Sequence, residues 1–233
     1  MLPARTTWPG MPNRHVAIDG PSASGKTVVS RALAARLGTL YLDTGAMYRA
    51  VAYLALHKGI DLDNEHALIE ELRANPLQIT VDADAPNGYR VYVAEREITE
   101  DLMRPDVTSV VSTVAAAPQV RAALVERQRA IAAVEPVVMA GRDIGTVVLP
   151  DARHKFFLTA ALPERAKRRR AELIASGVAV SEAEVGEALA ERDRLDSARA
   201  TSPLRAAADA VHIDSTALEI DAVIAAMLAV IEV

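Results

Sequence analysis

The sequence predicts an α/β fold built on a doubly wound parallel sheet, and three observations lead to this prediction. Beyond residue 14, short apolar runs alternate with helical stretches. A glycine-rich turn joins the first apolar run to the first helical stretch. The chain also ends in an amphipathic helix with one apolar stripe: Ile220, Val223, Ile224, Met227, Leu228 and Ile231. Alternating strands and helices of this kind build parallel sheets that helices cover on both faces.

The predicted strands are short and apolar, as strands buried on both faces are. They lie at 15–18, 40–42, 136–139, 155–158 and 211–213. A helix is predicted after the first strand, because Val29, Leu33 and Leu37 recur four apart and Gly38 follows them. Helical stretches separate the later strands as well. The whole pattern is typical of a parallel sheet.

Composition narrows the class of protein without identifying it. The chain has 233 residues, enough for one large domain with inserted subdomains. It has no cysteine, which excludes disulfides and agrees with a reducing compartment. A net charge of −5 and an aromatic content of 3% argue against a nucleic-acid partner. Because no long apolar stretch or signal-peptide core is present, we expect a cytoplasmic monomer that does not bind membranes.

The most informative motif is the turn after the first predicted strand, which matches the phosphate-binding pattern G-x-x-x-x-G-K-[ST] in full. In such a loop, backbone N–H groups and the helix N-terminus bind phosphate oxygens. We expect Lys26 to face the ligand and reach the outer phosphates, and the Thr27 hydroxyl to ligate Mg²⁺. The predicted nucleotide-binding residues are Gly20, Pro21, Ser22, Ala23, Ser24, Gly25, Lys26, Thr27 and Val28. A glycine turn without a ligand is the alternative, and the strand-turn-helix context argues against it.

One stretch interrupts the alternation. Residues 77–82 and 89–93 show period-two alternation on either side of Asn87-Gly88, a hairpin-turn signal, and 97–99 is a candidate third strand. We therefore predict that residues 63–103 form a small antiparallel insertion in a domain whose main sheet is parallel.

A second irregular stretch is a basic cluster, followed by Ser176-Gly177 and by a capping-box signal at Ser181 and Glu184. It could be a solvated helix face, or a lid that closes over the donor phosphates. The cluster comprises Arg165, Lys167, Arg168, Arg169 and Arg170.

Further polar segments follow predicted strands or lie near the end of the chain, at 42–49, 140–146 and 191–199. In open α/β sheets, ligands bind beyond the carboxyl ends of the strands. Each segment alone is compatible with a surface loop. Their arginines are suited to phosphate, because the planar guanidinium donates two parallel hydrogen bonds and stays charged. We therefore expect the three segments to converge on the phosphate site.

In combination, these motifs resemble the bacterial cytidylate kinases from residue 14 to the C-terminus. The resemblance rests on four blocks in this order and spacing, at 20–27, 42–49, 141–146 and 192–199. It implies the nucleoside monophosphate kinase fold, with a five-stranded parallel core, a lid and a monophosphate-binding domain that contains the hairpin insertion. It also implies that CMP and dCMP are phosphorylated by ATP, with Mg²⁺ as the metal.

The resemblance implies a division of the chain into a core, an insertion and a lid. Residues 1–13 would form a loose tail. The core would comprise 14–62, 104–160 and 200–233, with the hairpin subdomain at 63–103 and the lid and its flanking helices at 161–199.

The resemblance also implies roles for individual residues. The acceptor phosphate or the phosphoryl group in transit would contact Thr44, Arg49, Arg142 and Arg199, with Gly45 and Tyr48 beside them. Cytosine would be read by Ser112, Arg121 and Asp143, and the ribose and closed site held by Arg192 and Asp196. The catalytic set would be Lys26, Arg142, Arg192, Asp196 and Arg199.

The chain departs from the family pattern at Ala140, where the family commonly has an acidic residue. Asp43 is then the candidate for orienting the water shell of Mg²⁺. Two alternatives remain at this stage: a P-loop kinase of another nucleoside monophosphate or a small metabolite, and a regulatory GTPase. A GTPase needs an N-K-x-D element, which the sequence lacks.

Overall fold

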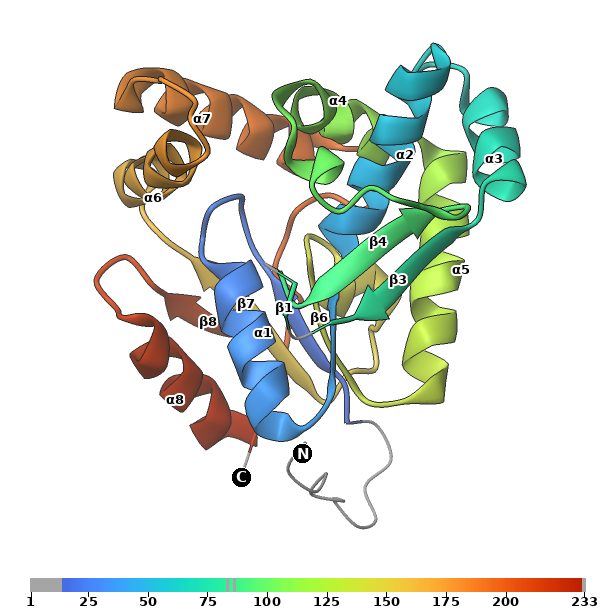
Figure 1. Ribbon diagram of the computed structural model, residues 1–233. Helices are drawn as coiled ribbons and strands as arrows, with labels where there is room; N and C mark the ends of the chain where they lie inside the picture. The colour runs from blue at the N-terminus through green and yellow to red at the C-terminus, as the bar shows by residue number, and fades with distance from the viewer. Residues whose placement is uncertain (1–13, 83, 86, 232–233) are drawn as a thin grey trace.

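The computed structural model describes residues 14–82, 84–85 and 87–231, and a five-stranded sheet lies at its centre (Figure 1). The strand order across the sheet is β2-β6-β1-β7-β8, and each pairing is parallel. The predicted strands are confirmed, with small shifts at their ends. Their bounds are β1 Val16–Asp19, β2 Leu40–Asp43, β6 Val137–Gly141, β7 His154–Thr159 and β8 Val211–Asp214.

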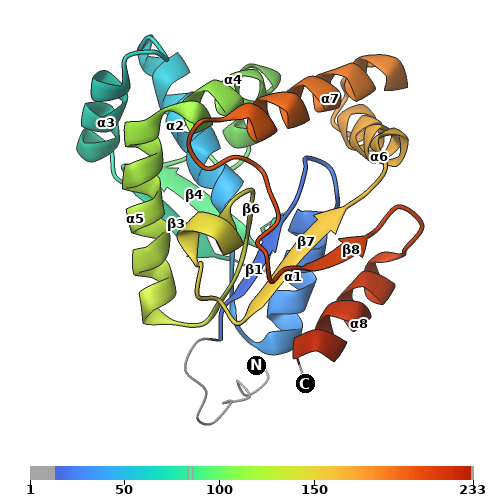
Figure 2. The same cartoon turned by 180° about the vertical axis from the view of Figure 1, so that it is seen from behind.

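Helices cover both faces of this sheet (Figures 1 and 2). Successive strand residues point to opposite faces, so Val16 and Ile18 belong to one core and Ala17 to the other. The first face packs against α1 (Lys26–Leu37) and α8 (Ile220–Ile231), and the second against α5 (Pro118–Val134) and the π-helical turn Ile144–Val148. The doubly wound α/β class is therefore confirmed.

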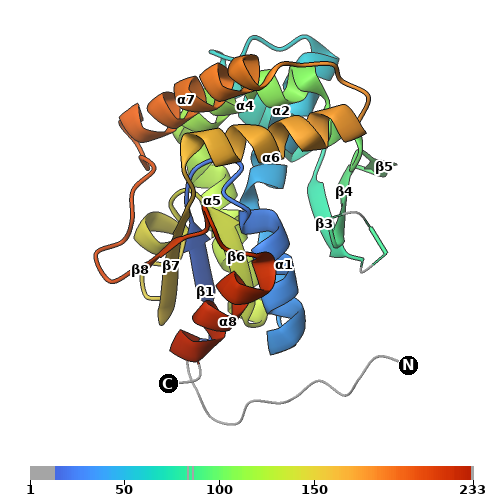
Figure 3. The ribbon, with the colours of Figure 1, turned by 90° about the vertical axis from the view of Figure 1, so that its left-hand side faces the viewer.

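Several helices lie at one end of the five-stranded sheet. Figure 3 shows α6 and α7 side by side above the end where the phosphate-binding loop lies, and their facing residues Ala166, Val185 and Leu189 form a small separate core. The predicted capping box starts α7, since Ser181 and Glu184 bond reciprocally. The bounds of these helices are α2 Thr44–Lys58, α3 Glu65–Ala74, α4 Pro105–Ala116, α6 Leu162–Ala175 and α7 Glu182–Ala198.

The insertion is an antiparallel sheet, in the order β3-β4-β5, as predicted. Its strands are β3 (Leu77–Val81), β4 (Tyr89–Val93) and β5 (Arg96–Glu97). The third strand overlaps the predicted 97–99 only at Glu97 and ends there, because the Thr99 hydroxyl takes the place of a backbone acceptor and accepts from the Val91 N–H at 3.0 Å.

Asn87-Gly88 closes a longer loop than the predicted tight turn, and Asp82 N donates to Gly88 O. Positions 83 and 86 of that loop, and the tail expected at 1–13, lie outside the described residues.

Candidate active site

The phosphate-binding loop connects β1 to α1, and two of its glycines are required by its geometry. Gly20 has φ +150°, and a Cβ atom built there would lie 2.0 Å from the Leu158 carbonyl oxygen of β7. Gly25 precedes α1 with φ +89°, in the left-handed region that favours glycine. The loop therefore turns sharply off the sheet and presents its backbone at the start of α1. Its last expected residue, Val28, exposes 43% of its surface on α1.

Lys26 is enclosed by this loop. Its Nζ donates to the Pro21 carbonyl at 2.5 Å and to Ser24 Oγ at 3.3 Å, and the residue is only 7% exposed. The Lys26 side chain is therefore buried against its own loop, and its expected contact with the outer phosphates stays a prediction. Burial lowers the pKa of Lys26 well below its usual range, and the positive charge of Arg142 lowers it further.

The end of β2 forms a second polar centre. Asp43 caps α2 by accepting from the Gly45 N–H at 2.9 Å, and its other oxygen accepts from Arg49 at 2.9 Å. Although burial alone raises the pKa of Asp43, the Arg49 guanidinium holds it below its usual range. The Thr44 hydroxyl donates to the Ala140 carbonyl at 2.9 Å, which joins α2 to β6.

Two of the three residues expected to read cytosine, Arg121 and Asp143, lie together, whereas the third, Ser112 of α4, contacts Asp196 instead. Arg121 of α5 forms an ion pair with Asp143 and also donates to the Ala115 carbonyl at 2.9 Å. The Tyr48 ring packs on the guanidinium of Arg121, 5.3 Å from its Cζ atom to the ring centroid. Burial raises the pKa of Tyr48 to about 12, so its hydroxyl stays protonated.

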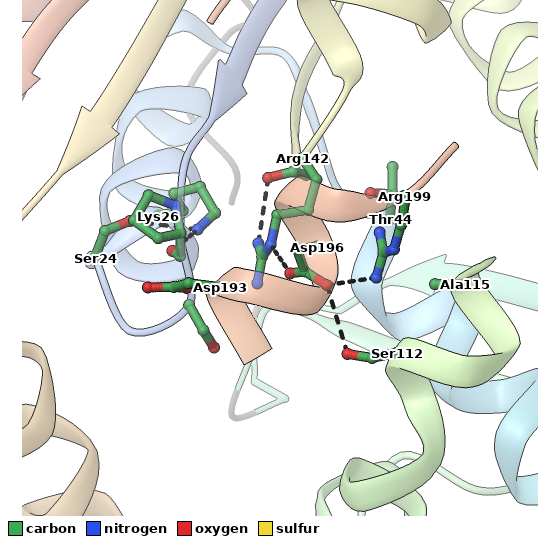
Figure 4. Close-up of polar contacts among 12 residues, drawn as sticks. Ser24, Lys26, Thr44, Ser112, Ala115, Arg142, Asp193, Asp196 and Arg199 are labelled. Carbon is green, nitrogen blue, oxygen red and sulfur yellow. Dashed lines mark hydrogen bonds and ion pairs between the residues drawn. The ribbon is translucent and has the colours of Figure 1, made fainter. Parts of the chain in front are cut away.

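Asp196 is the centre of the arginine cluster (Figure 4). One oxygen accepts from Arg142 Nε at 2.8 Å, and the other forms an ion pair with Arg199 and accepts from the Ser112 hydroxyl at 3.5 Å. Although burial alone raises the pKa of Asp196, Arg142 and Arg199 hold it below its usual range. One carboxylate of α7 thus gathers side chains from the segment after β6, from α4 and from the segment after α7.

Positive charge exceeds its local compensation in this cluster. Burial and the neighbouring charge of Arg142 lower the pKa of Arg192 to about 10. Within the part of the chain that the structure describes, four arginines of the cluster have a buried Nε atom with no hydrogen-bond partner: Arg49, Arg121, Arg192 and Arg199. Buried donors are rarely left without an acceptor, so the cluster is suited to an anionic ligand.

The basic stretch of α6 divides between two environments. Arg165 is buried, and it donates to the Ser22 carbonyl of the phosphate-binding loop at 3.1 Å and pairs with Asp193 at 2.7 Å. Arg168 donates to the carbonyl of Ser215 at 2.7 Å. Lys167 and Arg170 are exposed, and the side chain of Lys167 is 73% exposed. Arg169 is partly buried, and its charge helps to lower the pKa of Arg192. The solvated-face interpretation therefore fits only part of the cluster.

Asp19, which sequence reasoning missed, is fully enclosed at the junction of sheet and site. It ends β1 and accepts from the N–H groups of Ile144 and Gly145, both at 2.8 Å. It thereby anchors the turn that follows Arg142 and Asp143. The available signal was a carboxylate at the end of a buried strand, since an acid is seldom buried without a partner.

The site residues and the sheet define a class of protein. A phosphate-binding loop and arginines from the segments after β6 and α7 lie at one end of a doubly wound parallel sheet (Figure 4), and α5 and α7 contribute Arg121 and Arg192. The arrangement provides two positively charged regions for anions. The class is that of the P-loop kinases, in which positioning and charge neutralisation carry phosphoryl transfer.

Comparison with known proteins identifies the family. The family model for cytidylate kinase matches residues 16–233. A cytidylate kinase from Pelotomaculum thermopropionicum is 47% identical over 215 residues, which cover 92% of this chain and 94% of that protein. One from Lactiplantibacillus plantarum is 45% identical over 217 residues, or 93% of this chain and 94% of its own. The chain therefore belongs to the cytidylate kinase family and is a nucleoside monophosphate kinase.

A solved structure supports the fold independently. An uncharacterized protein from Eubacterium ventriosum is 14% identical, with a TM-score of 0.51, and the match covers 95% of this chain and 99% of that one. At this identity the likeness concerns the fold alone. The structure also contains no helix, among the residues it describes, with the length and apolar character needed to cross a membrane.

Proposed function

We propose that the chain transfers the γ-phosphoryl group of ATP to both CMP and dCMP at the arginine cluster. The observation that carries this proposal is that four arginines of the cluster, Arg49, Arg121, Arg192 and Arg199, each have a buried Nε atom without a partner among the described residues. A bound nucleoside monophosphate supplies the acceptors that these donors lack, with its phosphate oxygens facing Arg49 and Arg199. The family assignment supports cytidylate as the substrate.

The donor nucleotide occupies the phosphate-binding loop in this proposal. Lys26 neutralises charge on the transferred group, and the backbone N–H groups of 20–28 hold the phosphates. Mg²⁺ fits the donor set nearby, because the Thr27 hydroxyl and the Asp43 carboxylate supply the hard oxygen atoms that this ion prefers. When bound, the ion neutralises charge on the phosphates. Thr27 would ligate it directly and Asp43 would orient its water.

The acceptor nucleotide lies between the arginines and the base-reading pair. Arg49, Arg142 and Arg199, with Thr44, hold the acceptor phosphate in line with the γ-phosphate. An acceptor oxygen attacks the γ-phosphorus while its bond to the β–γ bridging oxygen breaks, so the products are the nucleoside diphosphate and ADP. Arg192 and Asp196 hold the ribose and the closed site.

The base is selected by hydrogen bonding. An ionised Asp143 accepts from the cytosine N4 amino group, while Arg121 donates to the acceptor edge of the ring, with Ser112 beside it. Uracil presents O4 to the same carboxylate, so it leaves a buried polar contact unsatisfied.

Closure completes the proposed mechanism. The lid at 161–199 and the insertion at 63–103 order around the two nucleotides and exclude water that would hydrolyse ATP. The closed state is favoured over the open state because two polyanions bind among the positively charged arginines. Hydrogen exchange in both segments should slow with a bisubstrate analogue, and exchange that does not change would contradict closure. Cytoplasmic localisation and a monomeric state remain part of the proposal.

The test of substrate class is a coupled assay with CMP, dCMP, UMP, AMP and GMP as acceptors. We expect the highest kcat/KM for CMP and dCMP. A higher value for another monophosphate would favour the alternative, a kinase of a different nucleotide, and would contradict the assigned base-reading residues.

A further inference from the structure

A single tyrosine connects the inserted sheet to the acceptor side of the site. Tyr89 begins β4, and its side chain is among the most deeply buried of the described residues. Its hydroxyl donates to Asp43 Oδ2 at 3.0 Å, across 46 positions of sequence. The hydrogen bond therefore ties the insertion directly to the end of β2.

The Asp43 carboxylate passes this contact on to an arginine. The oxygen that accepts from Tyr89 also accepts from Arg49, while the second oxygen accepts from Gly45. Arg49 is held at one end by this ion pair, and its buried Nε has no partner among the described residues. The direction of that Nε therefore depends on where Asp43 lies.

The position of Tyr89 is fixed from two sides. Its ring packs against that of Tyr41 of β2, with centroids 6.0 Å apart and planes inclined at 46°. The preceding Gly88 lies against α1, where a Cβ atom on it would approach Arg31 Cδ to 2.9 Å. Burial raises the pKa of Tyr89 far above its usual range, and the neighbouring Asp43 charge adds to this. The hydroxyl is thus a permanently protonated, preorganised donor.

We propose that Tyr89 is a positioning residue for the acceptor monophosphate, acting through Asp43 on Arg49. The proposal rests on the proposed function, in which Arg49 binds the acceptor phosphate. The insertion then has a defined part in the reaction: it fixes one of the arginines that hold the acceptor. If Tyr89 acted only on stability, its loss would weaken the binding of both ATP and CMP. In the proposed role, its loss weakens only the binding of the acceptor phosphate.

The experiment compares Tyr89→Phe with Tyr92→Phe. Tyr92 is a matched control, because it lies on the same strand and points to the opposite face. Both variants lose one hydroxyl and keep the ring. In Tyr89→Phe we expect KM for CMP to rise about tenfold, which a lost hydrogen bond to a charged group can produce. KM for ATP should stay unchanged, and Tyr92→Phe should match the native enzyme in both.

Cytidine separates the phosphate contact from the base contact. It has the base and ribose of CMP without the phosphate, so its Ki as a competitive inhibitor should be the same in Tyr89→Phe as in the native enzyme. The ratio of cytidine Ki to CMP KM then reports the contribution of the phosphate. Asp43→Asn should lower this ratio as well, and the double variant should lower it no further than the larger single effect.

Several outcomes would overturn the proposal. An unchanged ratio in Tyr89→Phe would do so, as would equal losses for cytidine, CMP and ATP, which indicate a structural role. A lower thermal midpoint with the ratio intact has the same meaning. Arg49→Met tests the proposed function separately: if it leaves the ratio unchanged, Arg49 does not bind the acceptor phosphate. If Arg49→Met lowers the ratio and Tyr89→Phe does not, only the positioning proposal fails.

Discussion

Arg121 and Asp143 form an ion pair whose side chains are only 3% and 6% exposed. Such a pair is costly to break from one side, because the remaining charge stays buried without compensation. Arg121 also stacks on Tyr48 and bonds to the Ala115 carbonyl, so its orientation is fixed from three directions. In the proposed function this pair reads the base, so the reading groups are preorganised and a base of the wrong polarity meets side chains that are held in place.

Asp143→Asn should narrow the discrimination between CMP and UMP. A buried polar mismatch can discriminate by about 10²–10⁵, and the amide can donate to uracil O4 as well as accept from cytosine N4. The measurement is the ratio of kcat/KM for the two acceptors on one enzyme preparation, which cancels any loss of folded protein. An unchanged ratio would show that Asp143 does not select the base.

Lys26→Ala should leave a folded protein with kcat lowered by about 10²–10³, the usual effect of removing one group that stabilises transition-state charge. The change removes a buried ammonium group, and burial lowers the pKa of this group. The folded state therefore loses the hydrogen bonds to Pro21 and Ser24 but no longer carries the desolvation cost of the charge. Circular dichroism and single-turnover kinetics check the two parts. Near-normal turnover would overturn the assignment of the phosphate-binding loop.

Asp43→Asn should raise the Mg²⁺ concentration needed for half-maximal rate. Asp43 and Ala140 are partners in register on adjacent strands, so Asp43 lies beside the position where the family commonly has an acid. Adding Ala140→Asp to the Asp43→Asn variant should bring the Mg²⁺ concentration for half-maximal rate part of the way back to its native value. If the Mg²⁺ requirement stays the same while KM for CMP rises, Asp43 acts only on Arg49 and α2.

The stability of the ligand-free protein should depend on pH through Asp19. Burial raises its pKa to about 6, against the opposing bonds from Gly145 and Ile144. Because the folded pKa is raised above the unfolded value, the native state holds the proton more tightly. The contribution of Asp19 to stability is therefore greatest below about pH 4 and falls as pH rises through about 6.

Asp19→Asn removes this dependence. The free energy of unfolding of the native chain, minus that of Asp19→Asn, should fall by about 2–3 kcal/mol between about pH 4 and about pH 7. Denaturant titrations at several pH values measure the difference. A difference that is constant with pH would mean that the pKa of Asp19 is the same in the folded and unfolded states.

The sequence was sufficient for the sheet, the phosphate-binding loop and the capping box because their signals are local. Gly25 and the Ser181–Glu184 pair each act within a few residues of themselves. The arginines of the site were predicted only through the resemblance to a family. The meeting of Arg142 and Arg199 at Asp196 is a property of the folded chain, since the contact between Arg142 and Asp196 spans 54 positions. The contact between Ser112 and the same carboxylate spans 84 positions.

Neither Asp19 nor Tyr89 could be assigned a partner from sequence. Asp19 bonds to a backbone 125 positions away, and any residue at 144 other than proline would offer the same N–H. Tyr89 fits the period-two pattern of a strand, which explains its burial but does not indicate a partner for its hydroxyl. Lys26 was expected to face the ligand, and its burial against Pro21 and Ser24 could not be predicted for a related reason. A motif specifies the residue type at a position, and the loop conformation decides what encloses it.

The first and last glycines of the phosphate-binding loop answer to different neighbours. Gly25 is required by its own backbone angle, whereas Gly20 is required by the Leu158 carbonyl of an adjoining strand. A side chain at Gly20 would consequently disturb the packing of β1 against β7. The inactivity of such a variant would carry no information about nucleotide recognition. A variant at Gly25 perturbs the entry to α1 with the sheet left intact. The two glycines of one motif therefore serve different parts of the fold: Gly20 lets the loop pass β7, and Gly25 lets the chain enter α1.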